Sequence, residues 1–343
     1  MKILLIRFSS IGDIVLTTPV IRCIKRQMDD DVELHMLTKE KFSSLSFNNP
    51  YIDKTYEYSN SLREVIKELK KEEYDYIVDL QKNNNSRRVC RALGCEHHSF
   101  HKLDFKKMLL TTFKINKLPD VHIVDRYFEA VEPLDVKNDG RGLEFYISES
   151  NMMQEPDLPE EFRNGFYAVV VGGSYNTKVI PTEKIVEIAE KLDEPVILLG
   201  GPGDMQRAKI VADAIGENVW NPVGMLNLEQ SASIIKMSKA VLTSDTGMMH
   251  IAAAFNKPMV SVWGNTVPEF GMYQYYPKGS ANKLNIVEIK DLKCRPCSKL
   301  GYKKCPKGHF KCMMNINTDE VVSLLRQNVI STEAEKSPAN KKH

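Results

Sequence analysis

Short apolar runs alternate with amphipathic stretches along most of the chain. In the first half the apolar runs are KILLIRF (2–8), DVELHMLT (31–38) and YDYIVDL (74–80). Residues 16–24 and 62–71 instead place their apolar side chains at helical spacing. Strands that alternate with helices are typical of parallel sheets with crossover helices, so the pattern predicts an α/β fold.

The same alternation restarts after a polar stretch with two prolines, residues 148–165, which we interpret as a linker. Strands are predicted at 166–173, 195–201, 240–245 and 258–264, with helices near 182–192, 204–215 and 227–238. A last helix begins at Thr318. The pattern predicts two Rossmann-like domains that face each other across a cleft, residues 1–150 and 151–330, followed by a disordered polar tail, 331–343.

Composition narrows the choice of function. The 343 residues carry a formal net charge of only +2, so nothing in the global charge favours nucleic acid as a partner. The N-terminal apolar run is too short for a signal peptide, and no stretch reaches the roughly 18–20 apolar residues of a membrane-spanning helix. Seven cysteines, an odd number, fit a reducing compartment. We therefore expect a cytoplasmic protein, attached at most to the surface of a membrane.

Three polar motifs directly follow predicted strands, where parallel sheets bind their ligands. The first is FSSIGD, in which Ser10 and Gly12 precede Asp13. Asp13 is interpreted either as a helix N-cap or as a carboxylate that takes a proton from a hydroxyl group.

The second motif is SDTGMMH, which contains Asp245, Thr246 and Gly247. Backbone amides at the start of a helix form an anion site suited to a diphosphate. The alternative is a capped core helix in which His250 is an ordinary buried histidine.

The third motif, GGSYNTK, offers Ser174, Thr177 and Lys178 for a phosphate contact, although a single loop lysine is also common as a solvated charge. Asp204, in the GGPGD segment after another strand, has the position of an acid that binds a ribose. Neither half contains the G-x-G-x-x-G fingerprint of dehydrogenases.

Two further groups of residues stand out. Four cysteines, at 294, 297, 305 and 312, lie within 19 residues with His309 nearby; they suit a structural Zn²⁺, labile disulfides or free packed thiols. Arg87, Arg88 and Arg91 open a basic region that continues to residue 107. This region is either a solvated face or a patch for an anionic acceptor or for the negative cytoplasmic leaflet of a membrane.

Together these motifs resemble glycosyltransferase family 9, the heptosyltransferases of lipopolysaccharide core assembly. The resemblance spans roughly residues 1–328 and is most specific in KILLIRFSSIGDIVLTTPVIRCIK and SDTGMMHIAAAFNKPMVSVWG. It implies a GT-B fold and an inverting transfer of heptose from an ADP-sugar donor, bound by the C-terminal domain, to a lipid-linked lipopolysaccharide acceptor, bound by the N-terminal domain.

The resemblance also implies roles for individual residues. Asp13 matches the catalytic base, beside Ser10 and Gly12, and the basic Arg87 and Arg88 are candidates for acceptor binding. The residues that match the donor site are Ser174, Thr177, Lys178, Asp204, Asp245, Thr246 and Gly247. The chemistry needs no metal, because Lys178 and a helix dipole carry the diphosphate charge.

The chain departs from the family where Val171-Gly172-Gly173 replaces His-Pro-Gly and where Ile180 replaces a tryptophan before Pro181. Two alternative functions fit the same two-domain plan: a nucleotide-sugar epimerase and a nucleotide-sugar-binding protein without catalysis. The first would turn over the donor without any acceptor, and the second would bind the donor without releasing ADP.

Overall fold

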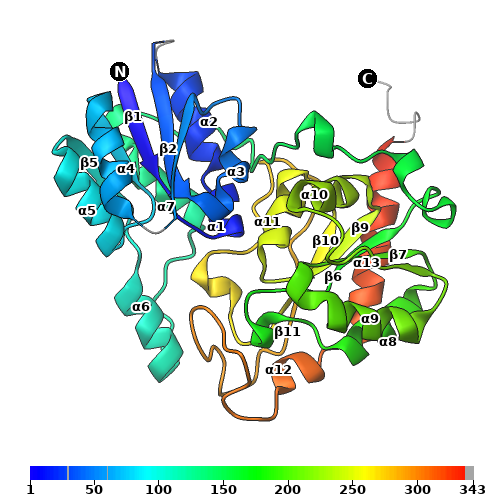
Figure 1. Ribbon diagram of the computed structural model, residues 1–343. Helices are drawn as coiled ribbons and strands as arrows, with labels where there is room; N and C mark the ends of the chain where they lie inside the picture. Colours follow the sequence, from blue (N-terminus) through cyan, green and yellow to red (C-terminus); the bar gives the residue numbers. More distant parts are fainter. Residues whose placement is uncertain (29–30, 60, 337–343) are drawn as a thin grey trace, which may run out of the picture. The chain divides into compact units, whose positions relative to one another are not determined.

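The computed structural model describes residues 1–28, 31–59 and 61–336. The chain forms two compact units, shown in Figure 1. Unit 1 comprises Met1–Asp104 and Pro119–Tyr146, and unit 2 comprises Phe105–Leu118 and the chain from Ile147 onward. Residues 105–118 therefore belong to unit 2, although they lie in the first half of the sequence.

Unit 1 contains a five-stranded parallel sheet in the order β3-β2-β1-β4-β5. Its strands are β1 Lys2–Ile6, β2 Glu33–Lys39, β3 Lys54–Tyr58, β4 Tyr76–Asp79 and β5 Glu96–Ser99. This is the order of a Rossmann sheet without its sixth strand, and it reverses between β1 and β4, where such sheets bind their ligands.

The helices of unit 1 cover the sheet with apolar side chains. They are α1 Ile11–Val15, α2 Thr18–Gln27, α3 Ser44–Phe47, α4 Leu62–Leu69, α5 Asn84–Leu93 and α7 Ile123–Tyr127. Leu62, Val65 and Leu69 of α4 pack with Leu4 and Ile77 of the sheet in one core, because their three- and four-residue spacing places them on one face of the helix.

Unit 2 contains a six-stranded parallel sheet in the order β11-β10-β9-β6-β7-β8. Its strands are β6 Tyr167–Val170, β7 Val196–Leu199, β8 Val219–Trp220, β9 Ala240–Ser244, β10 Met259–Trp263 and β11 Asn285–Glu288. The order again reverses once, between β6 and β9, so the loops after these two strands lie side by side.

The helices of unit 2 bury a second core against this sheet, with Val169, Leu198, Leu242 and Val260 at its centre. They are α8 Thr182–Leu192, α9 Met205–Ile215, α10 Leu228–Met237, α11 Gly247–Ala254, α12 Lys311–Met314 and α13 Thr318–Lys336. A short helix α6, Asp104–Met108, and a π-helical turn, Leu109–Phe113, open the segment that unit 2 takes from the first half.

The predicted α/β fold with two Rossmann-like parallel sheets is confirmed. Four strands were not predicted: β3, β5, β8 and β11 lie toward the edges of the sheets. Helix α13 runs to Lys336, six residues into the expected tail, and 337–343 lie outside the described residues. Within the described ranges, no helix has the length and apolarity needed to cross a membrane.

Candidate functional site

The loop after β1 leads directly into α1 and places Asp13 in the first turn of that helix. One carboxylate oxygen of Asp13, Oδ2, accepts hydrogen bonds from the backbone N–H of Ser10 at 3.1 Å and from its hydroxyl at 2.8 Å. The other oxygen, Oδ1, lies 2.5 Å from a guanidinium nitrogen of Arg7. Asp13 therefore supports the start of the helix and also forms an ion pair, and its side chain keeps 23% of its surface exposed.

Arg7 links the two strands between which the order of the sheet reverses. It is buried directly after β1 and donates to the carbonyl of Leu80, just after β4, at 2.6 Å. It also donates to the Tyr127 hydroxyl at 3.1 Å. Burial is the strongest single influence and opposes the charge of Arg7, but Asp13, Tyr127 and Asp79 together outweigh burial, and the pKa of Arg7 is raised. Sequence reasoning missed this role, which a charged residue at the end of the apolar run 2–8 could have indicated.

Lys102 is a second cation in the same environment. It is half-buried, and burial together with the positive charge of Arg7 lowers its pKa, although the carboxylates of Asp79 and Asp13 act in the opposite direction. Sequence reasoning placed Lys102 in the basic region but did not connect it with Asp13. The carboxyl end of this sheet thus holds two cations that act electrostatically on the partly exposed Asp13 carboxylate.

The other candidates of unit 1 have simpler environments. Gly12 is buried inside α1 and is not among the glycines with positive φ. Arg87 and Arg88 are exposed on α5, and neither forms an ion pair with a carboxylate in the described part of the chain. Their charges are therefore available to an anionic ligand, as the acceptor hypothesis requires.

In unit 2 the loops after β6 and β9 meet through an ion pair. Lys178 Nζ lies 2.5 Å from Asp245 Oδ2, and both side chains are largely buried, with 17% and 13% of their surfaces exposed. Asp245 also accepts a hydrogen bond from the Thr266 hydroxyl at 2.7 Å. The structure thus brings together two residues that are 67 positions apart and were predicted for the same site.

The start of α11 lies beside this pair. Thr246 is the N-cap of α11 and Gly247 is its first residue, and both are half-buried. A Cβ atom on Gly173 would lie 3.3 Å from Thr246, so the β6 loop passes close to this helix start. Ser174, in the same loop, is exposed. The helix amides and Lys178 together offer positive charge to an anion at this edge of the sheet.

The loop after β7 also packs against the β6 loop. Asp204 accepts from the backbone N–H of Gly201 at 3.0 Å and pairs with Arg207 at 3.3 Å. A Cβ atom on Gly172 would lie only 2.0 Å from Asp204 Oδ2, so this close approach requires glycine. Arg207 also donates to the carbonyl of Val171 at 3.2 Å. Sequence reasoning missed Arg207, which occupies an unremarkable helical position three residues after Asp204.

Thr177 fixes the position of its loop, and the donor contact implied for it stays a prediction. It is buried, and its hydroxyl accepts a 2.8 Å hydrogen bond from the backbone N–H of Tyr302 and donates to the carbonyl of Tyr302 at 3.1 Å. The backbone N–H of Thr177 also donates to that carbonyl at 3.2 Å. Thr177 therefore joins the loop that carries Lys178 to the cysteine-containing segment, which lies 125 residues further along the chain.

The cysteine-containing segment is held in place by a buried arginine. Arg295 donates to the carbonyls of Gly264, Ile289 and Thr266 at 2.5, 2.5 and 3.0 Å, and it pairs with Glu288 at 2.9 Å. Thr266 in turn contacts Asp245. The segment is thus part of the structure that surrounds the Lys178–Asp245 pair.

All four late cysteines are free thiols in the structure. Cys294 Sγ lies 3.8 Å from His309 Nε2, and burial raises the pKa of Cys297 and raises that of Cys312 to about 11. Within the described ranges, the thiols and His309 do not bring three ligand atoms within 4.8 Å of one another. The structural zinc therefore stays a prediction that rests on residue types and spacing.

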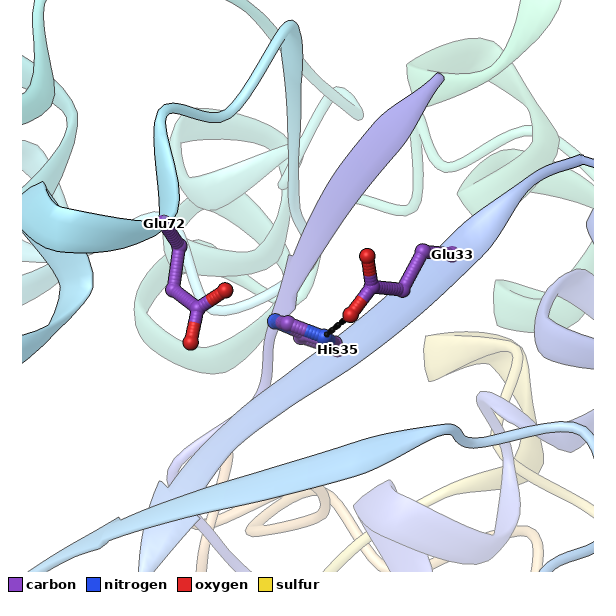
Figure 2. A group of neighbouring side chains, drawn as sticks. All are labelled: Glu33, His35 and Glu72. Atoms are coloured by element: carbon purple, nitrogen blue, oxygen red, sulfur yellow. Dashed lines mark hydrogen bonds and ion pairs between the residues drawn. The ribbon is translucent and has the colours of Figure 1, made fainter.

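A separate cluster of ionisable residues lies at the amino ends of the strands of unit 1. Figure 2 shows Glu33, His35 and Glu72, with His35 Nε2 2.7 Å from Glu33 Oε1. Lys2 and Lys54 pair with Glu72 at 2.7 and 2.6 Å, and these hydrogen bonds lower the pKa of Glu72. A metal ion would have to displace two lysines, so the cluster is best explained as a structural charge network.

The geometry defines an α/β protein with two Rossmann-like sheets, each with an ion pair where its strand order reverses. Residues 62–305 match the sequence profile of glycosyltransferase family 9 (heptosyltransferase), and the chain belongs to this family. It is therefore a glycosyltransferase, which favours sugar transfer over the epimerase and the non-catalytic alternatives.

Individual proteins resemble this chain over nearly its whole length. Lipopolysaccharide heptosyltransferase 1 of Campylobacter coli is 26% identical over 356 aligned positions, which cover 95% of this chain and 98% of the relative. The structure of the Escherichia coli ADP-heptose LPS heptosyltransferase II superposes with a TM-score of 0.73 at 19% identity, covering 97% and 100% of the two chains. A family 9 glycosyltransferase from Veillonella parvula superposes with a TM-score of 0.74 at 19% identity, covering 96% and 97%.

Proposed function

We propose that this enzyme transfers a heptose from ADP-heptose to a lipopolysaccharide-type acceptor on the cytoplasmic side of the membrane, with inversion at the anomeric carbon. The acceptor is suggested by the Campylobacter coli relative, a lipopolysaccharide heptosyltransferase, and the donor by the Escherichia coli ADP-heptose LPS heptosyltransferase II. The observation that carries the proposal is the pairing of Lys178 with Asp245, next to a helix start, in a family 9 glycosyltransferase.

Asp13 is the proposed general base. Its Oδ1 is held by Arg7, whereas Oδ2 faces the Ser10 side chain, which is exposed. An acceptor hydroxyl that takes the place of the Ser10 hydroxyl would give its proton to Oδ2 while its oxygen forms the new bond to the anomeric carbon. The anomeric bond to the β-phosphate oxygen breaks at the same time, and ADP leaves with the electron pair. General base catalysis of this kind contributes about 10²–10⁴-fold to the rate.

Lys178 and the amides at the start of α11 are proposed to stabilise the departing diphosphate. Lys178 is oriented by Asp245, and Asp245 is oriented by Thr266, so the cation is held in place before the donor arrives. Ser174 and Asp204 complete the proposed donor site, the first toward phosphate and the second toward ribose. Because a fixed cation and a helix dipole balance the charge of the leaving group, this mechanism needs no metal ion.

Arg87 and Arg88 are proposed to bind phosphate or carboxylate groups of the lipid-linked saccharide. Both are exposed and lack an ion pair in the described part of the chain, and arginine binds such anions through two parallel hydrogen bonds. The donor is thus bound by unit 2 and the acceptor by unit 1.

The Asp13→Asn variant tests the proposal. It should reduce transfer to a purified lipopolysaccharide acceptor by about 10²–10⁴-fold, because an amide cannot take the proton. Binding of ADP, measured by calorimetry, should be unchanged, because the proposed donor site lies in unit 2. The matched control is Asp53→Asn, which removes a carboxylate of unit 1 that also pairs with a cation, Lys25. Weaker ADP binding by Asp13→Asn, or normal transfer, would contradict the proposed role.

A further inference from the structure

Two segments of unit 2 carry a large share of the positive charge of the chain. Residues 105–118 contain four lysines, and residues 293–311 contain six lysines and Arg295, without any aspartate or glutamate in either segment. The whole chain has 47 lysines and arginines, so 36 remain elsewhere against 45 acidic residues. The nearly neutral net charge therefore hides a strongly basic region on an otherwise acidic chain.

The two segments contact each other although they are far apart in the sequence. Lys114 Nζ donates to the carbonyls of Pro296 at 2.6 Å and Cys294 at 3.3 Å. Segment 105–118 is also anchored by apolar contacts, since Leu110 packs with Val267 and Phe270 of unit 2. We call the combined surface of residues 105–118 and 293–311 the basic surface.

The basic surface also exposes large apolar side chains. Phe105, Phe113 and Leu300 have 68%, 61% and 62% of their surfaces exposed. Of the fourteen large hydrophobic side chains that are exposed in the described part of the chain, six lie in these 33 residues. The six are Phe105, Met108, Phe113, Ile115, Leu300 and Tyr302. Scattered apolar side chains are normal on a protein surface, whereas such a concentration marks an interaction site.

We propose that the basic surface docks the enzyme on an anionic lipid bilayer. Lysines are attracted to the negative surface potential of the bilayer, and aromatic and aliphatic side chains insert at the boundary between headgroups and acyl chains. Lys106, Lys117 and Lys303 are exposed and form no ion pair with a carboxylate among the described residues, so no internal charge competes for them. A polyanion such as DNA would use the lysines but not the exposed Phe105 and Phe113.

This inference extends the proposed function, because it identifies a surface by which an enzyme with a lipid-linked acceptor reaches its substrate. It differs from the sequence-based expectation that placed membrane contact in the basic region beginning at Arg87. The lysines 106 and 107 are common to both, whereas Phe113, Leu300 and the lysines of 293–311 are not.

Vesicle sedimentation of the full chain, without donor or acceptor, tests the docking surface. Wild-type protein should sediment with vesicles that contain phosphatidylglycerol, should not sediment with pure phosphatidylcholine, and should be released by salt. The double variant Lys303→Gln/Lys304→Gln should bind about 25-fold more weakly, at about fivefold for each lysine. Phe113→Ser should bind about tenfold more weakly because it loses the inserted ring.

Matched controls come from unit 1. Lys67→Gln/Lys70→Gln removes two exposed lysines, and Phe47→Ser removes a side chain that is 59% exposed. Both controls should sediment like the wild type. Melting temperatures and transfer to detergent-solubilised acceptor should be preserved in all variants, which separates docking from folding and from catalysis.

Three outcomes would overturn the inference: wild type that does not bind anionic vesicles, basic-surface variants that bind as well as the wild type, or loss of binding by lysine removal with no effect of Phe113→Ser. The last outcome, together with binding of the wild-type protein to immobilised DNA, would identify a general polyanion site. Because these measurements use neither substrate, docking can fail while the proposed transfer reaction stands, and the reverse also holds.

Discussion

The Lys178–Asp245 pair leads to a prediction about the sign of a double-mutant effect. In Lys178→Ala, the donor diphosphate loses a charged hydrogen bond worth about 1.5–3 kcal/mol. In the described part of the chain, the variant also leaves the Asp245 carboxylate with the Thr266 hydroxyl as its remaining hydrogen-bond partner, facing the same diphosphate. Two like charges about 5 Å apart at an effective dielectric constant of about 20 repel each other by about 3 kcal/mol.

Lys178→Ala should therefore weaken ADP binding by about 10³-fold or more, since about 1.4 kcal/mol corresponds to a factor of ten. Adding Asp245→Asn to this variant should restore binding by about tenfold or more, because it removes the repulsion while keeping the shape of the side chain. Isothermal titration calorimetry with ADP measures the affinities of the wild type, the two single variants and the double variant, which together form the double-mutant cycle.

Further weakening by Asp245→Asn in the Lys178→Ala background would refute this reasoning. It would show that Asp245 binds the donor directly rather than orienting Lys178. Equal ADP affinity of wild type and Lys178→Ala would place the diphosphate elsewhere. A melting curve of each variant shows whether a loss of affinity reflects a loss of folded protein.

Three other predictions concern the structure around the sites. Gly172→Ala should lower the free energy of unfolding in urea by about 1–3 kcal/mol because its Cβ would meet Asp204, whereas Gly203→Ala, which meets nothing within 4 Å, should change it little. Lys102 has a lowered pKa in the folded state. Between that pKa and 10.5, the folded state binds fewer protons than the unfolded state. The contribution of Lys102 to the free energy of unfolding therefore rises with pH. Lys102→Met should accordingly be more stable than wild type at neutral pH, with a difference that shrinks toward pH 10.5 in urea unfolding; a constant difference would contradict the shift. If the cysteine-containing segment holds zinc, mass spectrometry should find stoichiometric zinc in the purified protein, and Cys297→Ser should lose it. Chelation should also lower the melting temperature. A zinc-free protein whose melting temperature does not change with chelator would contradict the prediction.

The central strands of both sheets could be predicted because parallel strands buried on both faces are continuous apolar runs. The edge strands could not, since KTYEY of β3 and EHHS of β5 are polar and short and resemble loops. Strand ends also located most of the candidate site, because side chains that follow neighbouring parallel strands meet at one edge of a sheet. Asp13, Lys178 and Asp245 were found in this way.

Partners that are distant in sequence could not be predicted. The contact between Thr177 and Tyr302 joins two loops with no shared local pattern, so the buried role of Thr177 appears only in three dimensions. Arg207 likewise has no sequence feature that distinguishes it from a solvated helical arginine. The balanced net charge hid the basic surface, because its two segments lie about half the chain apart and are brought together by folding.

Because unit 2 takes residues 105–118 from the middle of unit 1, the polypeptide passes from one unit to the other three times, after residues 104, 118 and 146. A protein truncated after Tyr146 would keep this insertion but lose Val267 and Phe270, leaving Leu110 with only Leu118 of its apolar cluster. Separate expression of the two halves therefore calls for replacing 105–118 by a short polar linker in the first half, and a simple cut between sequence halves should yield an aggregating fragment.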